Sequence, residues 1–274
     1  MSSSNSSTTY RDAGRARAEH EALVEGTGVV AERVGLDEAA ARLAEHGVVV
    51  VPSPSPDPAA IVQVAAAVLG TTLRKVAPIR RQSDEGGEAL PLHNDSAYVL
   101  ADLHGQLVQL RDPDDDYVLQ RIEVPTPDGG DTVVIDGYAL IERIAAQRPE
   151  LHAFLTGVDV DFYGGWETPT RGVPSTPLLR RMVEHTRGGR RVVRCSQMAI
   201  PAPRDPQAAR HVELLGEYFD VLATAMATVP HFRLDSGEVL IADNYRCLHG
   251  RTSYRGHREI SVLTVSSVAA WSGW

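Results

Sequence analysis

Two histidines and one aspartate are the residues of this chain best suited to metal chemistry. His93 and Asp95 are separated by one residue, and His249 comes much later, in the run DNYRCLHGR (residues 243–251). In a β-strand, side chains two positions apart point to the same side, so a strand over 92–98 lets His93 and Asp95 reach one metal. Two imidazoles and one carboxylate leave coordination positions open, as Fe(II) needs in order to bind a co-substrate and oxygen together. The sequence therefore predicts an iron site in which His93, Asp95 and His249 are the metal ligands and the catalytic residues.

An arginine follows the last of these ligands at the head of a predicted strand. Arg258 begins the run REISVLTV, whose alternating and β-branched residues are typical of a strand. Arg258, Ile260 and Val262 would then share one face of the sheet. An arginine among apolar neighbours needs an anion, and its planar fork suits the carboxylate of a dicarboxylic acid.

Taken together, these motifs resemble those of a known family of oxygenases. The chain resembles the taurine dioxygenase (TauD/TfdA) superfamily of iron and 2-oxoglutarate oxygenases, and in motif its γ-butyrobetaine and trimethyllysine hydroxylase branch, from about residue 36 to 268. The resemblance is carried by His93-x-Asp95, by the run GGDT (residues 129–132), by the run around His249 and by Arg258.

The resemblance implies a fold and a set of cofactors. The expected fold is mainly β with flanking helices, a double-stranded β-helix of the jelly-roll, cupin-like type. The expected cofactors are Fe(II), 2-oxoglutarate as cosubstrate and O2. Arg258 would bind the far carboxylate of 2-oxoglutarate, and Thr132 would contact the same cosubstrate.

The expected reaction is the oxidation of an unactivated C–H bond in a small polar molecule, an amino acid or a biosynthetic intermediate of the natural-product kind. Hydroxylation would release succinate and CO2, whereas desaturation, cyclisation and epoxidation use the same cofactors and stay open. A carboxylate at Asp95 speaks against halogenation, because related halogenases have a small residue there. Two other classes stay open as well: a non-catalytic jelly-roll binding module, and a metal-dependent hydrolase or isomerase of the cupin type.

Residues near the metal ligands are candidates for contacts with the primary substrate. Asn94, Ser96 and Tyr98 flank the ligands, and Arg194 lies in a predicted strand over 191–197 that in relatives faces the cavity. The aromatic segment 163–166 is a further candidate. For each of these residues a structural role, as core or surface, is an equally good interpretation.

Composition bears on partners and location. The net charge is −9 and the pI is about 5.6, which disfavours a nucleic-acid partner because phosphate binding needs clustered positive charge. The spacing of Cys195 and Cys247 suggests packing residues of a reducing compartment and no disulfide framework. The polar N-terminal segment fits neither a signal peptide nor a membrane anchor. We expect a cytoplasmic protein that binds a small molecule, with a homo-oligomer possible.

The chain is expected to form one domain over residues 23–274, preceded by a flexible tail over 1–22 with a frayed helix in it. Helices are predicted over 36–46, 59–69, 137–147, 148–155 and 206–229, and strands over 47–51, 71–81, 92–98, 106–111, 117–124, 132–135, 158–163, 191–197, 238–242 and 258–267. Residues 83–89 are predicted to be a loop. The acidic segment 111–117 is interpreted as the solvated tip of a hairpin, with a lid or a partner contact as the alternative.

Overall fold

The computed structural model describes residues 5–103, 105–112, 114–166 and 177–271, and for 5–13 and 97–112 it describes the backbone alone. Its helices are α1 (Asn5–Val24), α2 (Leu36–His46), α3 (Ala60–Leu69), α4 (Gly137–Gln147), α5 (Pro149–Gly157) and α6 (Ala208–Thr228), with a short 3-10 turn at Gly70–Thr72. None of the described helices is long and apolar enough to cross a lipid bilayer.

The larger of two main sheets contains the strand that carries Arg258. Its strands follow the order β1-β2-β17-β8-β19-β3, and β4 and β9 also pair with β19. Their bounds are β1 (Glu32–Arg33), β2 (Val48–Pro52), β3 (Leu73–Val76), β4 (Arg80–Gly87), β8 (Tyr117–Val124), β9 (Asp128–Gly129), β17 (Glu238–Asp243) and β19 (Tyr254–Ser267).

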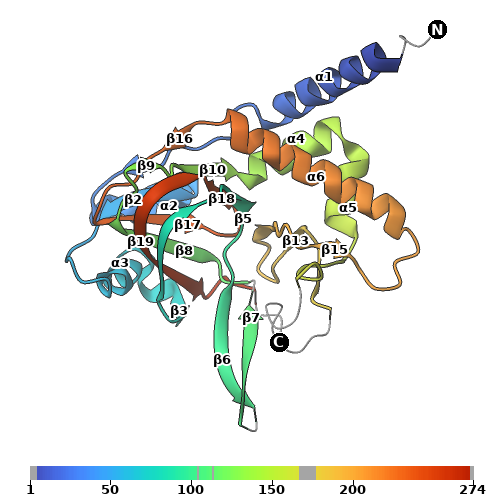
Figure 1. Cartoon of the computed structure of the whole chain (residues 1–274). Helices are drawn as coiled ribbons and strands as arrows, with labels where there is room; N and C mark the ends of the chain where they lie inside the picture. The colour runs from blue at the N-terminus through green and yellow to red at the C-terminus, as the bar shows by residue number, and fades with distance from the viewer. Residues whose placement is uncertain (1–4, 104, 113, 167–176, 272–274) are drawn as a thin grey trace.

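The smaller main sheet carries both histidines. Its order is β16-β10-β18-β5, with β5 (Leu90–His93), β10 (Thr132–Asp136), β16 (His231–Phe232) and β18 (Cys247–Arg251). Three minor sheets complete the fold: β12-β11-β15, β13-β14 and the hairpin β6-β7 (Figure 1). Their strands are β6 (Ala97–Leu103), β7 (Gln106–Asp112), β11 (Val160–Asp161), β12 (Leu179–Arg180), β13 (Val183–His185), β14 (Arg191–Val193) and β15 (Ile200–Pro201).

Central strands of the two main sheets, such as β2 and β10, are buried on both faces, and the alternation of their side chains defines the layers. In β2, Val48 and Val50 pack in the core between the sheets, while Val49 and Val51 pack against α2 and α3. In β10, Val134 joins the core between the sheets, while its two neighbours face the helices α4, α5 and α6. The molecule is therefore two facing sheets with helices outside each of them (Figure 1).

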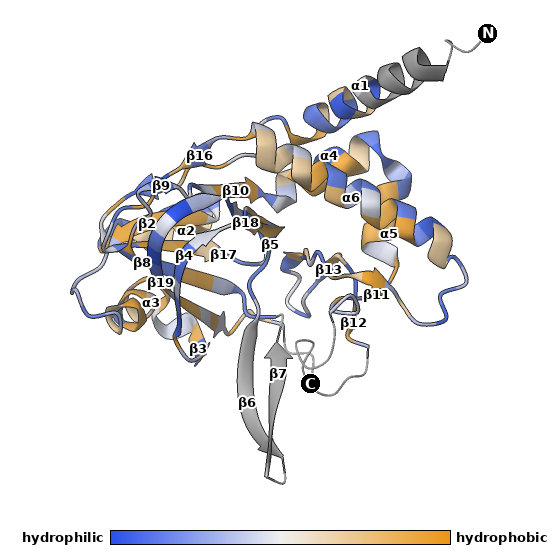
Figure 2. Ribbon diagram, viewed as in Figure 1, coloured by the Kyte–Doolittle hydropathy of each residue, from blue (hydrophilic) through white to orange (hydrophobic). Residues whose placement is uncertain are grey.

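Hydropathy follows these layers. Figure 2 shows apolar residues along β8 and α3, whereas β4 and the start of β19 are hydrophilic. Two facing antiparallel sheets of this kind form a double-stranded β-helix, so the predicted fold class is confirmed. The predicted helix over 137–147 and the predicted strand over 117–124 coincide with α4 and β8.

Other predictions of secondary structure were wrong. The single strand predicted over 92–98 is interrupted, because β5 ends at His93 and β6 begins at Ala97. Residues 80–87 form strand β4, although 83–87 were predicted to be a loop. This strand pairs with β19, and most of its polar side chains are exposed. The strands predicted over 158–163 and 191–197 shorten to Val160–Asp161 and Arg191–Val193.

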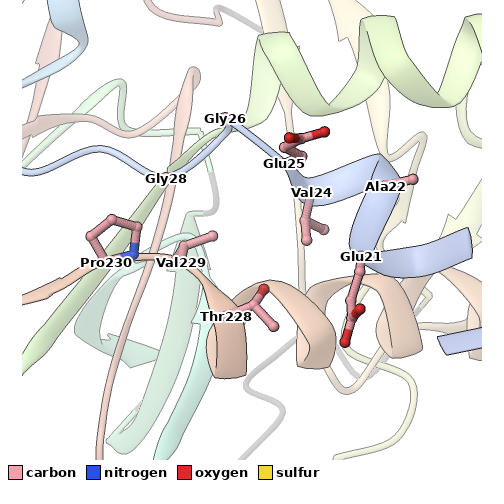
Figure 3. A pocket seen from close by; sticks show the side chains of 9 residues that line it. All are labelled: Glu21, Ala22, Val24, Glu25, Gly26, Gly28, Thr228, Val229 and Pro230. Atoms are coloured by element: carbon pink, nitrogen blue, oxygen red, sulfur yellow. The ribbon is translucent and has the colours of Figure 1, made fainter. Parts of the chain in front are cut away.

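Helix α1 covers most of the predicted N-terminal tail. It runs from Asn5 to Val24, and Leu23 and Val24 are buried in the core against α4 and α6. A hollow of about 640 Å³ lies where the end of α1 passes the end of α6, lined by Glu21 and Glu25 on one side and by Thr228 and Pro230 on the other (Figure 3). The division of the chain between residues 22 and 23 stays a prediction.

The interpretation of the acidic segment as a solvated hairpin tip was wrong. Asp114, Asp115 and Asp116 are buried, and the side chains of the latter two have no exposed surface. Each carboxylate pairs with cations from other parts of the chain: Asp114 with Arg180 and Arg194, Asp115 with Lys75, and Asp116 with Arg190. We call these three aspartates the acidic clamp.

The acidic clamp also holds the end of β19. Asp116 accepts hydrogen bonds from the backbone N–H of Ser267 at 2.7 Å and from its hydroxyl at 2.5 Å, and Ser266 donates to Asp115. Buried carboxylates stay charged in such a setting only when cations and hydrogen-bond donors compensate for the lost water. The clamp therefore joins the segment between β7 and β8 to the end of β19 and, through Lys75, to β3.

Replacing one clamp residue should destabilise the protein far more than replacing an exposed aspartate. We expect Asp116→Ala to lower the free energy of unfolding by about 3 kcal/mol, because Arg190 and Ser267 lose a buried partner. The matched control is Asp159→Ala, which breaks an exposed ion pair with Arg181 and should change this free energy by about 0.5 kcal/mol or less. Urea unfolding measures both, and equal losses in the two variants would contradict the clamp.

Candidate metal centre

Strand pairing brings His93 and His249 together from distant parts of the chain. In the small sheet β18 runs antiparallel to β5, and His249 lies directly opposite His93. Their neighbours Leu248 and Leu92 face the helices, so both imidazoles point into the space between the two sheets. The ring centroids are 4.6 Å apart. Ligand atoms of His93, Asp95 and His249 all lie within 4.8 Å of one another, as one metal ion requires, and we call these three residues the triad.

A glycine next to His249 allows β5 to come this close. A Cβ on Gly250 would lie 2.7 Å from the carbonyl oxygen of Leu90, a distance that side-chain atoms do not tolerate. The register between β18 and β5 shifts between His249 and Arg251, as in a β-bulge. The glycine after the histidine is therefore part of the geometry that holds the two imidazoles opposite each other.

Asp95 lies beyond the end of β5 and is positioned by an asparagine. The side-chain oxygen of Asn244 accepts from the backbone N–H of Asp95 at 3.0 Å, and its amide nitrogen donates to the carbonyl oxygen of Asp95 at 2.9 Å. The same nitrogen donates to the carbonyl of Asp115, at 2.8 Å. Asn244 thus replaces the missing strand pairing at Asp95 and connects it to the acidic clamp.

Asn94 completes this arrangement from the other direction. Its side-chain amide donates to the backbone carbonyl of Asn244 at 2.6 Å, and its side-chain oxygen accepts from the backbone N–H of Cys195 at 2.6 Å. The side chain of Asn94 therefore bonds to the backbone of Asn244, and the side chain of Asn244 bonds to the backbone of Asp95, next to Asn94. This pairing orients Asp95 toward His249, whose Nε2 lies 3.2 Å from a carboxylate oxygen of Asp95.

The protonation of His93 suits a metal ligand. Its Nδ1 lies 2.8 Å from the carbonyl oxygen of Pro91, which can only accept, so Nδ1 carries the proton and Nε2 offers its lone pair. Burial, together with the charge of His249, lowers the pKa of His93 to about 4. The imidazole is consequently neutral near pH 7 and has no proton to lose before it binds a metal.

The carboxylate of Asp95 stays charged in spite of its burial. Burial alone would raise its pKa, but the hydrogen bond from His249 and the charges of His249 and Arg80 hold that pKa well below the usual value. Arg80 on β4 lies 3.2 Å from one carboxylate oxygen, and His249 lies beside the other. Once a metal ion displaces the proton of the His249–Asp95 hydrogen bond, the triad would offer two nitrogen lone pairs and one anionic oxygen, a donor set that fits a divalent transition metal.

A cavity of about 240 Å³ next to the triad is lined by Arg258, the residue predicted to bind an anion. His93, Asp95 and His249 line one part of this cavity, and Arg258 with Thr132 lines another, so we call it the arginine cavity. Arg258 shares it with Ile260 and Val262, as the strand pattern predicts. Thr132 arrives through the pairing of β10 with β18, in which it lies opposite Arg251.

Two arginines, Arg258 and Arg251, line the arginine cavity, and Asp84 lines it as well. Burial and the neighbouring charge of Arg251 lower the pKa of Arg258 to about 10, which leaves it charged at neutral pH. The guanidinium groups of Arg258 and Arg251 lie 5.8 and 4.4 Å from the ring centre of Tyr254. Within the described part of the chain, no ion pair is formed by Arg258. A half-buried cation of this kind is suited to an anionic ligand.

The residues predicted to contact substrate have different positions. Ser96 and Asn94 line a second cavity beside the triad, although the amide group of Asn94 is occupied as described above. The side chain of Tyr98 lies outside the described residues. Arg194 does not line this cavity: it is buried and paired with Asp114 and Glu184. Neither the predicted substrate contact nor its alternative as a surface charge fits Arg194, which belongs with the acidic clamp.

Sequence reasoning missed two residues that hold the triad in place. Arg80 had no recognisable partner in the sequence, because its contact with Asp95 depends on the pairing of β4 with β19. Asn244 was visible as part of the run before His249, but its role was not, since it acts on a residue distant in the chain. Cys195 and Cys247 are free and buried, in agreement with the prediction of packing residues.

Comparison with known sequences identifies the family. Residues 18–264 match the model of the family described as taurine catabolism dioxygenase TauD, TfdA family. Human gamma-butyrobetaine dioxygenase is 25% identical over 151 residues, and the protein of that name from Pongo abelii is equally similar. This match covers 53% of the chain but spans only 38% of the length of these relatives.

Solved structures share the fold. A taurine dioxygenase from Burkholderia xenovorans has a TM-score of 0.56 at 20% identity and covers 85% of this chain and 83% of its own. PvcB of Pseudomonas aeruginosa, an Fe, alpha-ketoglutarate dependent oxygenase from an isonitrile synthetic pathway, has a TM-score of 0.54 at 15% identity and covers 85% and 80%. Because the family model matches most of its length, the chain belongs to the TauD/TfdA dioxygenase family.

Proposed function

We propose that this protein is an Fe(II)- and 2-oxoglutarate-dependent oxygenase that oxidises a small molecule and releases succinate and CO2. One observation carries the proposal: the triad and Arg258 line a single cavity. Family membership and the fold support the same chemistry. His93, Asp95 and His249 would hold the metal, and the arginine cavity would hold the cosubstrate.

The residues present fit Fe(II) in number and type. Two imidazoles and one carboxylate would supply three ligands to the metal and leave positions for 2-oxoglutarate and O2. When bound, Fe(II) activates O2 and couples the loss of CO2 from 2-oxoglutarate to the oxidation of the substrate. The chain itself positions the reactants. Asn244 and Asn94 hold Asp95, the Pro91 carbonyl fixes the orientation of His93, and the sheets exclude bulk water.

The arginine cavity fits the cosubstrate in charge. 2-Oxoglutarate has two carboxylates, one of which belongs to the keto acid end that chelates iron. Arg258 would bind the distal carboxylate through its planar fork, with the charge of Arg251 nearby and the hydroxyl of Thr132 as a further donor. Because Arg258 is half-buried, its attraction for a carboxylate is screened less than at an exposed site.

For the primary substrate we propose a small molecule that carries a carboxylate, such as an amino acid or a biosynthetic intermediate, and hydroxylation of a C–H bond as the outcome. Arg80 is the positively charged residue that lines the second cavity beside the triad, where it also pairs with Asp95, and a substrate carboxylate would approach it there. Desaturation, cyclisation and epoxidation need the same metal and cosubstrate, and product masses distinguish them. Hydroxylation adds one oxygen, whereas desaturation removes two hydrogens.

Loss of the aspartate ligand should abolish both cofactor binding and turnover. Under anaerobic conditions, Fe(II) together with 2-oxoglutarate should give the wild-type protein a weak visible charge-transfer band. In Asp95→Ala we expect no band. Replacing a residue that hydrogen-bonds to a metal ligand typically costs about 10- to 100-fold in activity, and we expect the loss of succinate formation in Asp95→Ala to be greater than that. Asp159→Ala, which alters an exposed aspartate, should retain the band. Turnover with zinc and without 2-oxoglutarate would reject the proposal in favour of a hydrolase or isomerase.

Replacing Arg258 should weaken cosubstrate binding specifically. We expect Arg258→Gln to raise the dissociation constant of 2-oxoglutarate about ten- to a hundredfold, since a hydrogen bond to a charged group contributes about 1.5–3 kcal/mol. Metal affinity should change little, because Arg258 is not one of the triad. Arg255→Gln, an exposed arginine on the same strand, is the control. Equilibrium dialysis gives both constants, and an unchanged 2-oxoglutarate affinity in Arg258→Gln would remove this residue from the cosubstrate site.

A further inference from the structure

The second cavity beside the triad differs in character from the arginine cavity. It has a volume of about 320 Å³ and shares Leu90, His93 and Asp95 with the arginine cavity, but its described lining contains neither Arg258 nor Arg251. Much of its lining is aromatic or apolar, namely Pro91, Phe162, Tyr163, Trp166, Cys195 and Met198. We call it the aromatic chamber. Its volume lies at the lower end of the range of about 300–1000 Å³ that is usual for small-molecule sites.

Three aromatic rings form one wall of the aromatic chamber. Tyr163 and Trp166 are stacked, with ring centroids 4.9 Å apart and an angle of 5° between their planes. Phe162 meets Tyr163 edge-on, with a centroid distance of 5.0 Å. Flat rings of this kind attract another flat, apolar body more strongly than they attract a polar chain.

The backbone holds this wall in place before any ligand binds. Gly165 donates to the carbonyl of Met198 at 2.7 Å, and Trp166 donates to the carbonyl of Tyr163 at 3.0 Å. A Cβ at residue 165 would lie 3.0 Å from the same Met198 carbonyl, so the close approach depends on glycine. A wall fixed in this way loses little conformational freedom when a ring packs against it.

Besides His93 and Asp95 of the triad, the polar lining residues of the aromatic chamber are Arg80, Asn94, Ser96, Ser196 and Gln197, and some of them are already engaged. Asn94 is bonded to Asn244 and to Cys195, and the hydroxyl of Ser196 accepts from the backbone N–H of Met198. Among the described lining residues, Arg80 is the only lysine or arginine. Because part of this polar lining is engaged, a polar body buried here would replace only some of the hydrogen bonds that it loses to water, which disfavours its binding.

We propose that the primary substrate has an aromatic or alicyclic ring that packs against Tyr163 and Trp166, with its carboxylate toward Arg80. This inference rests on the proposed function for its chemistry, and it narrows the expected substrate from a small polar molecule to a ring-bearing acid. Tyr163 and Trp166 are then residues that determine specificity. The triad lies beside this wall, so the oxidised atom of the substrate belongs to the ring or to the chain that joins the ring to the carboxylate.

The test compares ring acids with linear acids of similar size. The protein is loaded anaerobically with Fe(II) and 2-oxoglutarate and titrated calorimetrically with 3-phenylpropanoate, 3-cyclohexylpropanoate and indole-3-propanoate, and with hexanoate and adipate. We expect the tightest ring acid to bind about tenfold more tightly than either linear acid, which corresponds to about 1.4 kcal/mol. If no ring acid binds more tightly than the linear acids, the proposal is overturned.

Variants of the wall separate stacking from general damage. Trp166→Ala should weaken binding of the tightest ring acid about tenfold and leave the linear acids unaffected, whereas Trp166→Phe should keep most of the ring affinity. Val212→Ala, on the exposed side of α6, is the surface control and should change neither. Equal weakening of ring and linear acids in Trp166→Ala would mean that the residue is structural, and this would also overturn the proposal.

The same samples keep the two proposals apart. Retention of 2-oxoglutarate is measured by equilibrium dialysis in parallel with the titrations. A protein that retains 2-oxoglutarate but prefers linear acids rejects the ring-bearing substrate and keeps the oxygenase. A protein that prefers ring acids but does not retain 2-oxoglutarate rejects the oxygenase and keeps the aromatic chamber as a ring-binding site.

Discussion

The pairing of β5 with β18 is the constraint on which the rest of the site depends. It places His249 opposite His93 with both imidazoles between the sheets, and Gly250 is needed for the strands to come close enough. Because the core on one side of the small sheet and the core between the sheets both fix the register, a slip of either strand by one residue would turn its histidine toward the helices. The packing of the whole double layer thus stabilises the position of two metal ligands.

The third ligand depends on side chains instead of strand pairing. Asp95 follows the end of β5, and Asn244 satisfies its backbone N–H and C=O as a neighbouring strand would. Asn244 is in turn bound to Asp115 of the acidic clamp, which fixes the end of β19, the strand that carries Arg258. A connected set of buried polar contacts therefore links the carboxylate of the triad to the large sheet. Such a set orients its members well only when every partner is present.

Much of the site was predictable because its residues lie in regular patterns. The alternation in β19 placed Arg258 on the same face as Ile260 and Val262, whereas strand β18, which carries His249, was not among the predicted strands. The interruption after His93 was not predictable, since the backbone of Asp95 bonds there to Asn244, which is distant in the sequence. The acidic clamp was misread for a related reason. Three successive aspartates indicate a solvent-exposed segment unless the cations that pair with them are known. Those cations, Lys75, Arg190 and Arg194, lie far from the aspartates in the sequence.

The central claim is that one iron ion binds between His93, Asp95 and His249 with 2-oxoglutarate extending from it to Arg258. The most direct measurement is anomalous X-ray diffraction at the iron absorption edge, on crystals grown without oxygen in the presence of Fe(II) and 2-oxoglutarate. The account predicts one strong anomalous peak within bonding distance of all three side chains, and density for the cosubstrate that ends at the guanidinium of Arg258. A peak elsewhere in the molecule, or cosubstrate density directed away from Arg258, would contradict it.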